Sequence, residues 1–411
     1  MIVFLELTVM VFGIIIISKI NNEKKKYILN TAGKFHHFEL GKEILKKNQL
    51  SKIVSSYPWF KLKNENIPKK FIEANGLIRI LREPLIKSKS FKQLDHLLNI
   101  YTQKQIDNIT SKIIDKNHDI DVLIAQSKCG LKSGQNIQNK GKLYICDRLS
   151  THIDFQNNIL HEEYESLKLP YTPINKWYLE RERAEYETSD LILVPSNFVK
   201  STFHQDLKKK VKVLEFGINN KNFYRNENIK KSNTNFDILF LASKSVRKGL
   251  HYLIDAFEKF KHPNKRLHIV GSNTTDKYFY EKKLKKENII IYGHINHLKL
   301  NEIINFCHVY VLPSIEEGFA YTILQVAAAG CPVIVTENTG AGDFVRRSNC
   351  GFVVPIRSVN SILDKLTILA DNKILLNELS ENAINYSLEN NWENYFKKLD
   401  SIIEDKYKDL N

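Results

Sequence analysis

The stretch "IEEGFAYTILQVAAAGCPVIV", from Ile315 to Val335, decides the fold. It joins a turn at 316–319 to a helix of small and apolar residues that begins near Ala320. A Gly-Cys-Pro stop at 330–332 ends that helix, and a buried strand follows. Another apolar strand, "HVYVLPS", comes directly before the turn. Strand, turn, helix and strand in this order are typical of a parallel α/β sheet.

The same alternation of strands and helices runs through the rest of the chain and is interrupted once. Apolar runs such as "YILNTA" and "FDILFLAS" alternate with amphipathic stretches, while residues 218–235 form a polar linker rich in Lys and Asn. We therefore expect two Rossmann-like parallel-sheet domains, residues 27–217 and 236–390, facing across a cleft. Because open parallel sheets bind ligands at the carboxyl ends of their strands, that cleft is the expected site.

Composition favours an anionic partner. The chain has 411 residues, and 61 Lys and Arg against 46 Asp and Glu give a net charge of +15. A phosphorylated ligand, an acidic membrane face or a nucleic acid would each fit. The lysines are scattered rather than gathered with aromatic residues, which argues against base stacking. Five cysteines without a C-x-x-C pair argue against a zinc site and favour a reducing cytoplasm.

Residues 1–26 form an apolar N-terminal extension. The run lacks the basic start and the small-residue cleavage site of a signal peptide. It is barely as long as the ~20 apolar residues that a spanning helix needs. The basic stretch "KINNEKKK" would keep everything after it in the cytoplasm. A membrane anchor and a buried extension both stay open, so we expect a cytoplasmic protein that the inner membrane face can hold.

The turn and helix of the opening stretch favour a phosphorylated sugar ligand. A helix N-terminus exposes unpaired N–H groups and a partial positive charge, which suit a phosphate. Gly318 has no Cβ to keep that phosphate away. Glu317 would repel a phosphate, so it is expected to accept hydrogen bonds from sugar hydroxyls. Gln325 lies eight residues after Glu317 and so ~80° from it around the helix, where it could hold a second polyol. Helix capping by Glu317 and a surface role for Gln325 stay open.

Two further positions favour anion binding. Arg247 and Lys248 follow a strand and begin a helix, where basic residues oppose the helix dipole. Anion binding therefore explains them better than local stability, although a solvated basic pair stays open. Gly33, between a strand and the helix that contains His36 and His37, is a second place where a phosphate could approach the backbone.

The stretch "CDRLSTHIDFQNNILHEEY" places polar groups at another strand end. These are Asp147, Arg148, Ser150, Thr151 and His152. The histidine could donate a hydrogen bond to a sugar hydroxyl or act as a base. A purely structural histidine is the alternative.

Together these motifs resemble a GT-B glycosyltransferase of glycosyltransferase family 4, within the bacterial glycosyl transferases group 1. The resemblance rests mainly on Glu317 to Val333. This stretch begins with "EGFA", has seven residues between the polar positions Glu317 and Gln325, and continues through a small-residue helix to "GCPV", as in the family pattern. "RKG" before "YLIDAF" resembles the family's diphosphate-binding lysine element, and "SDLILVPSNFVKSTF" resembles its interdomain strand and helix. The resemblance runs from Tyr27 to the end. It implies the GT-B fold, with a C-terminal helix, 391–411, that returns toward the N-terminal domain.

The resemblance also implies roles for single residues. Donor-binding roles fall to Arg247, Lys248, Glu317, Gly318, Phe319, Ala320, Gln325 and Gly33, acceptor-side roles to Asp147, Arg148 and His152, and catalytic roles to His152, Glu317 and Lys248. Two positions depart from the family pattern. Gln325 replaces an acid, and its amide can still accept from a ribose hydroxyl. Ser243 stands where many members have an arginine, which Arg247 would replace.

The function that the resemblance implies is a retaining glycosyltransferase of hexosyltransferase type that needs no metal and no cofactor. It would move a sugar from a nucleotide-diphosphate donor to a polysaccharide or lipid-linked oligosaccharide acceptor, as in polysaccharide or lipopolysaccharide biosynthesis. We expect association with an anionic membrane surface and no nucleic acid partner. Two alternatives remain: a nucleotide-sugar epimerase or isomerase on the same fold, and a catalytically degenerate protein that binds a membrane surface.

Overall fold

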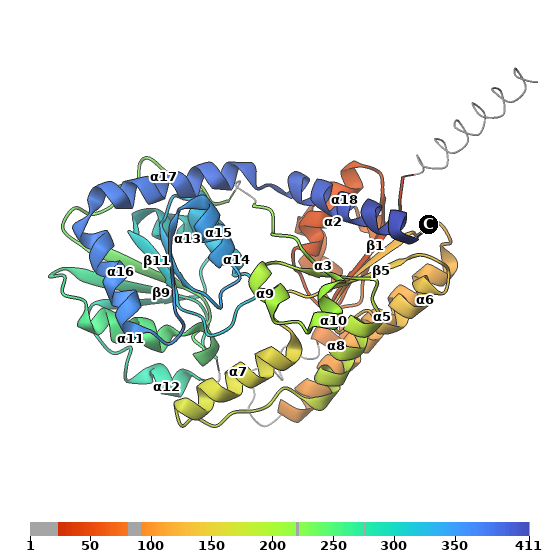
Figure 1. Cartoon of the computed structure of the whole chain (residues 1–411), viewed down its shortest axis with the longest axis horizontal. Coiled ribbons are helices and arrows are strands. Elements are labelled where there is room, and N and C mark those ends of the chain that lie inside the picture. Colours follow the sequence, from red (N-terminus) through yellow and green to blue (C-terminus); the bar gives the residue numbers. More distant parts are fainter. Residues whose placement is uncertain (1–23, 81–91, 219–221, 275, 411) are drawn as a thin grey trace, which may run out of the picture. The chain divides into compact units, whose positions relative to one another are not determined.

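A computed structural model describes residues 24–80, 92–218, 222–274 and 276–410 (Figure 1). The chain divides into two compact units: one runs to residue 125 and includes 129–145, and the other comprises 126–128 and 146–411. The expected N-terminal extension, 1–26, lies outside the described residues except for its last three. Among the helices of the described ranges, none is long and apolar enough to cross a membrane.

The first sheet has seven strands in the order β3-β2-β1-β4-β5-β6-β7. The pairings β1–β2, β1–β4, β2–β3 and β6–β7 are parallel. The strands are β1 (Tyr27–Thr31), β2 (Leu50–Ser55), β3 (Ile72–Ala74), β4 (Val122–Gln126), β5 (Leu143–Asp147), β6 (Leu191–Val194) and β7 (Val211–Val213).

The helices of this half of the chain alternate with its strands. They are α2 (His37–Lys46), α3 (Trp59–Leu62), η1 (Lys63–Glu65), η2 (Lys69–Phe71), α5 (Lys92–Lys116), α6 (Leu131–Gln138), α7 (Ile153–Ser166), α8 (Lys176–Thr188), α9 (Asn197–Ser201) and α10 (Gln205–Lys208). Polar side chains fix where several of them begin. The side chains of His152, Asn175 and Ser196 accept backbone N–H groups at the starts of α7, α8 and α9.

The second sheet lies wholly in the second unit and is parallel throughout. Its order is β10-β9-β8-β11-β12-β13. Its strands are β8 (Phe236–Leu241), β9 (Lys265–Val270), β10 (Ile289–Gly293), β11 (Val309–Leu312), β12 (Val333–Thr336) and β13 (Gly351–Val354). Sheet growth changes direction between β8 and β11, and at such a switch point the loops after the two strands part and leave room for a ligand.

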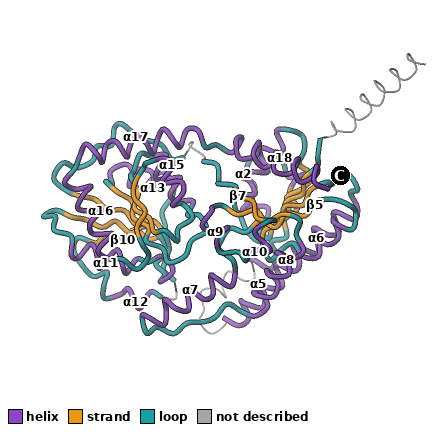
Figure 2. Tube along the Cα trace, viewed as in Figure 1, coloured by secondary structure: helices purple, strands orange, loops and turns teal. Residues whose placement is uncertain are grey.

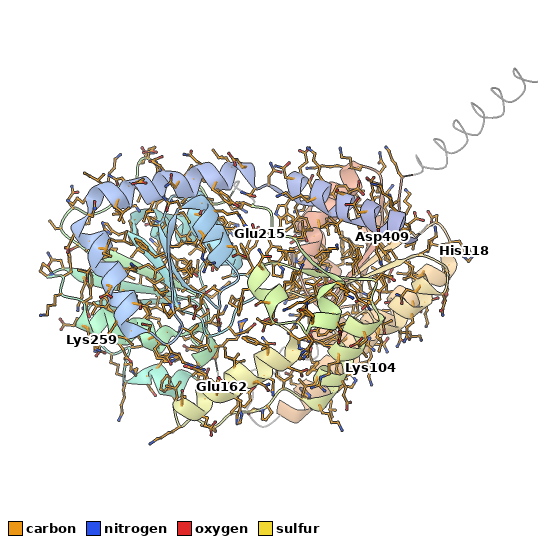
Figure 3. All side chains as sticks on the ribbon, viewed as in Figure 1. Lys104, His118, Glu162, Glu215, Lys259 and Asp409 are labelled. Carbon is orange, nitrogen blue, oxygen red and sulfur yellow. The ribbon has the colours of Figure 1, made fainter. Side chains whose placement is uncertain are left out.

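Helices lie on the faces of this sheet (Figure 2). The helices of this half of the chain are η4 (Val246–Lys248), α11 (Leu250–Lys259), α12 (Lys277–Glu281), α13 (His297–Phe306), α14 (Tyr321–Ala328), α15 (Gly342–Ser348), α16 (Val359–Asp371), α17 (Lys373–Glu389) and α18 (Trp392–Leu410). Every residue of β8, β11 and β12 is buried, as expected of parallel strands covered on both faces. Charged side chains such as Lys259, Glu162 and Asp409 are exposed (Figure 3).

The predicted α/β class with two parallel sheets is confirmed, and the fold is that of GT-B proteins. Most predicted strands and helices form close to the expected residues, α8 at the predicted bounds. The elements that were not predicted include the three-residue strand β3, the 25-residue helix α5 and the helix α6. The domain boundaries at 217 and 236 stay predictions.

Candidate functional site

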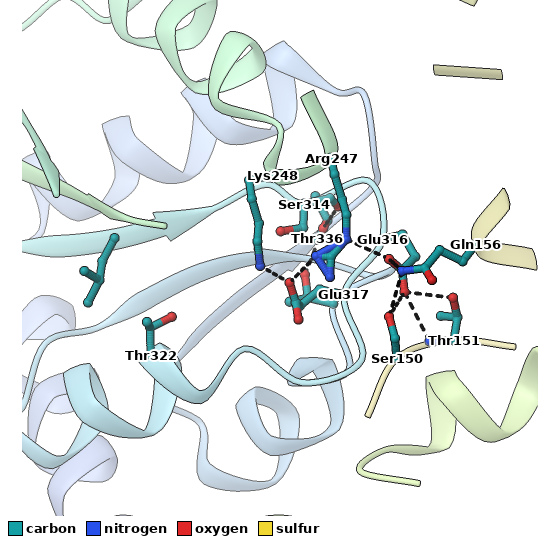
Figure 4. Close-up of polar contacts among 12 residues, drawn as sticks. Ser150, Thr151, Gln156, Arg247, Lys248, Ser314, Glu316, Glu317, Thr322 and Thr336 are labelled. Atoms are coloured by element: carbon teal, nitrogen blue, oxygen red, sulfur yellow. Dashed lines mark hydrogen bonds and ion pairs between the residues drawn. The ribbon is translucent and has the colours of Figure 1, made fainter. Parts of the chain in front are cut away.

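The β8/β11 switch point brings two polar loops together. One loop leads from β8 to η4, which ends with Arg247 and Lys248; the other leads from β11 through Glu316 and Glu317 to α14. The backbone N–H of Ile315 donates to the carbonyl of Arg247 at 2.9 Å, which ties the two loops to each other. Two stretches almost seventy residues apart thereby form one site (Figure 4).

Gly249 lets the first loop lie against the second. It has a positive φ of 66°, and a Cβ there would stand 1.8 Å from the carbonyl oxygen of Pro313. Any other residue would push the turn away from β11 and move Lys248 with it. The Arg-Lys-Gly turn is therefore shaped to set Lys248 beside the second loop.

Lys248 and Glu317 form the ion pair at the centre of the site. The Lys248 ammonium contacts the Glu317 carboxylate, and Nη1 of Arg247 donates to the same carboxylate oxygen at 3.0 Å. Burial lowers the pKa of the Lys248 ammonium, and Glu317 opposes part of that effect. A poorly solvated ammonium of this kind needs an anion next to it, which Glu317 supplies here and a phosphate could supply instead.

Glu316 points the other way, into a ring of donors from a distant part of the chain (Figure 4). Its Oε1 accepts the Ser150 hydroxyl at 2.6 Å and, from Thr151, the hydroxyl at 2.8 Å and the N–H at 3.1 Å. Its Oε2 accepts Nε2 of Gln156 at 3.0 Å and Nε of Arg247 at 2.9 Å. The side chain is fully buried. Glu316 therefore anchors the 150–156 segment to the donor loop.

The charge of Glu316 is stable in this environment. Burial alone would raise the pKa of the carboxyl group, but Arg247 and the hydrogen bonds from Ser150 and Thr151 outweigh it and hold the pKa at about 2. The carboxylate stays ionised at neutral pH and keeps all five hydrogen bonds.

Arg247 is the link between the two acids. Its Nε donates to Glu316 and its Nη1 to Glu317. Both carboxylates therefore accept from the Arg247 guanidinium, and its predicted role as a diphosphate ligand stays a prediction. Arg247 thus connects Glu317 to Glu316, the residue that anchors the 150–156 segment.

The predicted acceptor-side residues differ in their surroundings. Asp147 ends β5 and is buried. Arg148 is also buried, with its guanidinium 2.9 Å from the Glu182 carboxylate and its Nε donating to the carbonyl of Thr151 at 2.9 Å. These contacts shape the loop. A direct role of Arg148 toward an acceptor stays a prediction, and its ion pair supports a structural one.

His152 caps helix α7. Its Nδ1 accepts the N–H of Asp154 at 3.3 Å, and its ring packs against Tyr186 and Phe203 with centroids 5.0 Å away. Burial lowers its pKa to about 4. The imidazole is therefore neutral at pH 7, and because Nδ1 accepts, the proton sits on Nε2. In this form it can donate to a sugar hydroxyl, while proton uptake would break the cap.

Acidification should destabilise the fold through this cap. The pKa of His152 rises from about 4 in the folded protein to its ordinary value of 6.5 on unfolding, so between these values the unfolded state binds more protons and stability falls as pH falls. At 1.36 kcal/mol per unit the loss reaches ~3 kcal/mol at most. We expect His152→Asn, which keeps a capping oxygen, to flatten the thermal-unfolding midpoint between pH 6.5 and pH 4. An unchanged pH dependence would mean that another group causes the loss of stability. His308 is the residue to compare, because burial lowers its pKa to about 4 as well.

The turn residues after Glu317 have their side chains committed to packing. A Cβ on Gly318 would lie 2.0 Å from the carbonyl oxygen of Leu149, so the 149–150 backbone requires a glycine at this position. Phe319 packs edge-on against Phe216, with centroids 5.7 Å apart. Only the backbone of this turn and of Ala320 is left for a donor. The donor-binding role of residues 318–320 stays a prediction.

The helix α14 carries the other two polar candidates. The Thr322 hydroxyl lies 2.8 Å from the Tyr310 hydroxyl and is held by it. Gln325 is half-buried on the second turn. In the first unit, Gly33 follows β1 and is buried, and a Cβ there would meet the Phe35 ring at 2.7 Å. The roles predicted for Gln325 and Gly33 are untested by these contacts.

Sequence reasoning missed Glu316 and Gln156. The two adjacent acids were visible, but only one was assigned a role. The pairing of Glu316 with Ser150, Thr151 and Gln156 spans at least 160 residues of chain, and no local pattern reports it.

The chain is similar to known glycosyltransferases. The family described as glycosyl transferases group 1 matches residues 221–386, which contain β8 to α16, most of α17 and both loops of the site. An uncharacterized glycosyltransferase of Methanocaldococcus jannaschii is 27% identical over 214 residues, covering 50% of this chain and 56% of that protein. The capsular polysaccharide biosynthesis glycosyltransferase CapM of Staphylococcus aureus is 27% identical over 224 residues, covering 50% and 58%. The chain thus spans little more than half of these two relatives.

Solved structures match nearly the whole chain and show its fold. Sucrose-phosphate synthase from Thermosynechococcus elongatus superposes with a TM-score of 0.70 at 16% identity, covering 93% of this chain and 99% of that one. HepE from Anabaena, in complex with UDP, superposes with a TM-score of 0.66 at 15% identity, covering 93% and 100%. The fold is GT-B, and the half that holds Lys248 and Glu317 is similar to group 1 glycosyltransferases.

Proposed function

We propose that the protein is a metal-independent, retaining glycosyltransferase that transfers a sugar from a nucleotide-diphosphate donor. The observation that carries the proposal is the largely buried ion pair of Lys248 and Glu317 at the β8/β11 switch point. It lies in the region matched by group 1 glycosyltransferases. The structural neighbour HepE was crystallised with UDP and with UDP-glucose, which supports a nucleotide sugar as the donor class.

Donor binding would exchange partners within the ion pair. The diphosphate takes the place of the Glu317 carboxylate beside Lys248, so the ammonium keeps an anionic partner. Because Lys248 is already largely removed from water, donor binding adds little further desolvation cost for it. Glu317, released from Lys248, turns to the hydroxyls of the donor sugar. The cationic charge of Lys248 then meets the diphosphate as negative charge develops on it, which stabilises the departing group.

The transfer step balances without a protein nucleophile. The bond between the anomeric carbon and the diphosphate oxygen breaks, and the acceptor oxygen bonds to that carbon on the same face. The acceptor hydroxyl proton passes to the departing diphosphate oxygen. His152 is neutral with Nδ1 occupied, so its contribution is a hydrogen bond from Nε2 and the placement of the sugar. Rate acceleration comes mainly from positioning and electrostatics.

The acceptor is proposed to be a polysaccharide or a lipid-linked oligosaccharide presented at an anionic membrane surface. The net charge of +15 supports such a surface. The name of the CapM relative, which places it in capsular polysaccharide biosynthesis, supports a glycan acceptor.

Product analysis tests the reaction class. We expect the full-length protein, in EDTA, to consume one of UDP-, GDP- or ADP-sugars only when a lipid-linked oligosaccharide fraction is added, and to form a glycoside with the anomeric configuration of the donor. The anomeric proton coupling in the NMR spectrum reads the configuration. An isomerised nucleotide sugar formed without acceptor would overturn the proposal in favour of an epimerase, and an inverted product would overturn the retaining step.

A further inference from the structure

Large hydrophobic side chains are exposed along one stretch of the first unit. Of the fourteen that are exposed in the described part of the chain, seven fall between residues 35 and 101, so less than a sixth of the described chain carries half of them. Four lie in the connections after β1, β2 and β3: Phe35 in a loop, Phe60 in the short helix α3, and Leu77 and Ile80 in helical residues. Leu77 and Phe60 are 69% and 56% exposed. A concentration of this kind marks an interaction surface.

These four residues share one edge of the first sheet. The parallel strands β1, β2 and β3 end at Thr31, Ser55 and Ala74, and each exposed residue follows one of these ends. Because parallel strands end at a common edge, the loops after them are neighbours.

Hydrogen bonds join these loops directly. Arg79 donates to the carbonyl of Ala32 at 3.1 Å and to the Tyr57 hydroxyl at 2.8 Å, and Lys34 pairs with Glu65. The loops after β1, β2 and β3 therefore present their apolar side chains as one surface.

Helix α5 brings three more exposed side chains toward this edge. The helix lies between β3, which ends at this edge, and β4, which is parallel to β1 and so starts at the opposite edge. The N-terminal half of α5 is therefore at the edge in question. Leu94, Leu97 and Tyr101 are exposed there and lie three and four residues apart, on one face of the helix. We call Phe35, Phe60, Leu77, Ile80 and this face the edge surface.

Positive charge surrounds the edge surface. Residues 56–71, which join β2 to β3 and include the connection that begins at this edge, contain four Lys and one Glu. Lys63, in η1, and Lys69 and Lys70, in η2, are exposed in the same β2–β3 connection as Phe60. The Lys69 ammonium lies 5.8 Å from the centroid of the Trp59 ring, so cations and aromatic side chains are interleaved.

We propose that the edge surface docks on an anionic lipid bilayer. Exposed aliphatic and aromatic side chains enter the headgroup region, and the lysines around them meet lipid phosphates. Aliphatic side chains such as Leu77 and Leu97 offer nothing to stack on a nucleic acid base, and a second copy would bring two strongly basic surfaces together. This docking rests on the proposed function in one respect, the lipid-linked acceptor, and it adds the surface that would meet the membrane.

A fluorescent probe at single positions tests the docking. All five native cysteines are buried, so an introduced surface cysteine can be labelled selectively with an NBD probe. Leu77→Cys and Phe60→Cys place the probe on the edge surface. Ile374→Cys and Leu388→Cys, 82% and 62% exposed on α17 of the second unit, are matched controls. The full chain is used, so any attachment through residues 1–23 is common to all four variants.

Vesicles of phosphatidylcholine with and without phosphatidylglycerol provide the readout. We expect the probes at 77 and 60 to brighten several-fold and shift to the blue with anionic vesicles only, to be quenched by nitroxide-labelled lipid, and to lose the response when Lys69→Glu and Lys70→Glu are added. The control probes should stay in water.

Three results would overturn the docking: probes at 77 and 60 that stay water-like, an equal response at 374, or a lipid-independent dimer in sedimentation that buries the probe. The nucleotide-induced thermal shift of the same variants reports the donor site separately, so failure of the docking and failure of the proposed function are distinguishable.

Discussion

Replacing Lys248 by Ala should lower kcat by about a hundredfold or more, the usual effect of removing one group that stabilises developing negative charge. The variant keeps Arg247 on Glu317, so the fold should persist with a near-normal unfolding midpoint. Glu317→Gln should reduce turnover as strongly, because an amide accepts from sugar hydroxyls less well than a carboxylate and no longer pairs with Lys248. Initial rates at saturating donor and acceptor measure both.

Lys299→Ala is the matched control for the first variant. Lys299 also pairs with an acid, Glu302, but it does so on the exposed face of α13. We expect wild-type turnover from it. Full activity of Lys248→Ala or of Glu317→Gln, with the fold intact, would remove the central ion pair from the mechanism.

Glu316→Ala should be the most destabilising single change in the site. It leaves the Arg247 guanidinium short of a buried partner and removes the acceptor of the Ser150 and Thr151 hydroxyls. Breaking a buried ion pair from one side typically costs 3–5 kcal/mol, so a loss of about that size in the free energy of unfolding is expected. Urea unfolding measures it, and Glu302→Ala, an exposed acid, should cost well under 1 kcal/mol.

The gentler change Glu316→Gln separates a positioning role from a structural one. An amide of the same shape keeps part of the hydrogen bonding but loses the charge that holds Arg247. If Glu316 places the 150–156 segment for the acceptor, the KM for acceptor should rise while the donor-induced thermal shift stays. A uniform loss of stability with unchanged KM values would make Glu316 structural only.

The parts of the site that sequence could predict are local ones. Lys248 follows β8 and Glu317 follows β11, and parallel strands that alternate with helices put both strand ends on one edge. No local sequence pattern predicts the strand order that makes β8 and β11 neighbours. It followed from the fold that the motif around Glu317 implies.

The parts that could not be predicted depend on long-range contacts. Glu316 and Glu317 are adjacent and chemically identical, yet one turns to Lys248 and the other to Ser150, Thr151 and Gln156. That choice depends on where the 150–156 segment lies. Gly318 was explained by space for a phosphate, whereas the Leu149 carbonyl fills the position of its missing Cβ. The three-residue strand β3 is too short for a clear periodic pattern.

A thermal-shift titration with nucleotide sugars tests the central claim most directly. Full-length protein, in EDTA, is titrated with UDP-, GDP- and ADP-sugars, with Lys248→Ala and Lys299→Ala alongside. A ligand that binds only the folded state stabilises it by RT ln(1 + [L]/Kd). We predict that one nucleotide class raises the unfolding midpoint of the wild type and of Lys299→Ala but not that of Lys248→Ala. No shift with any class, or an equal shift in Lys248→Ala, would contradict a donor site built on Lys248 and Glu317.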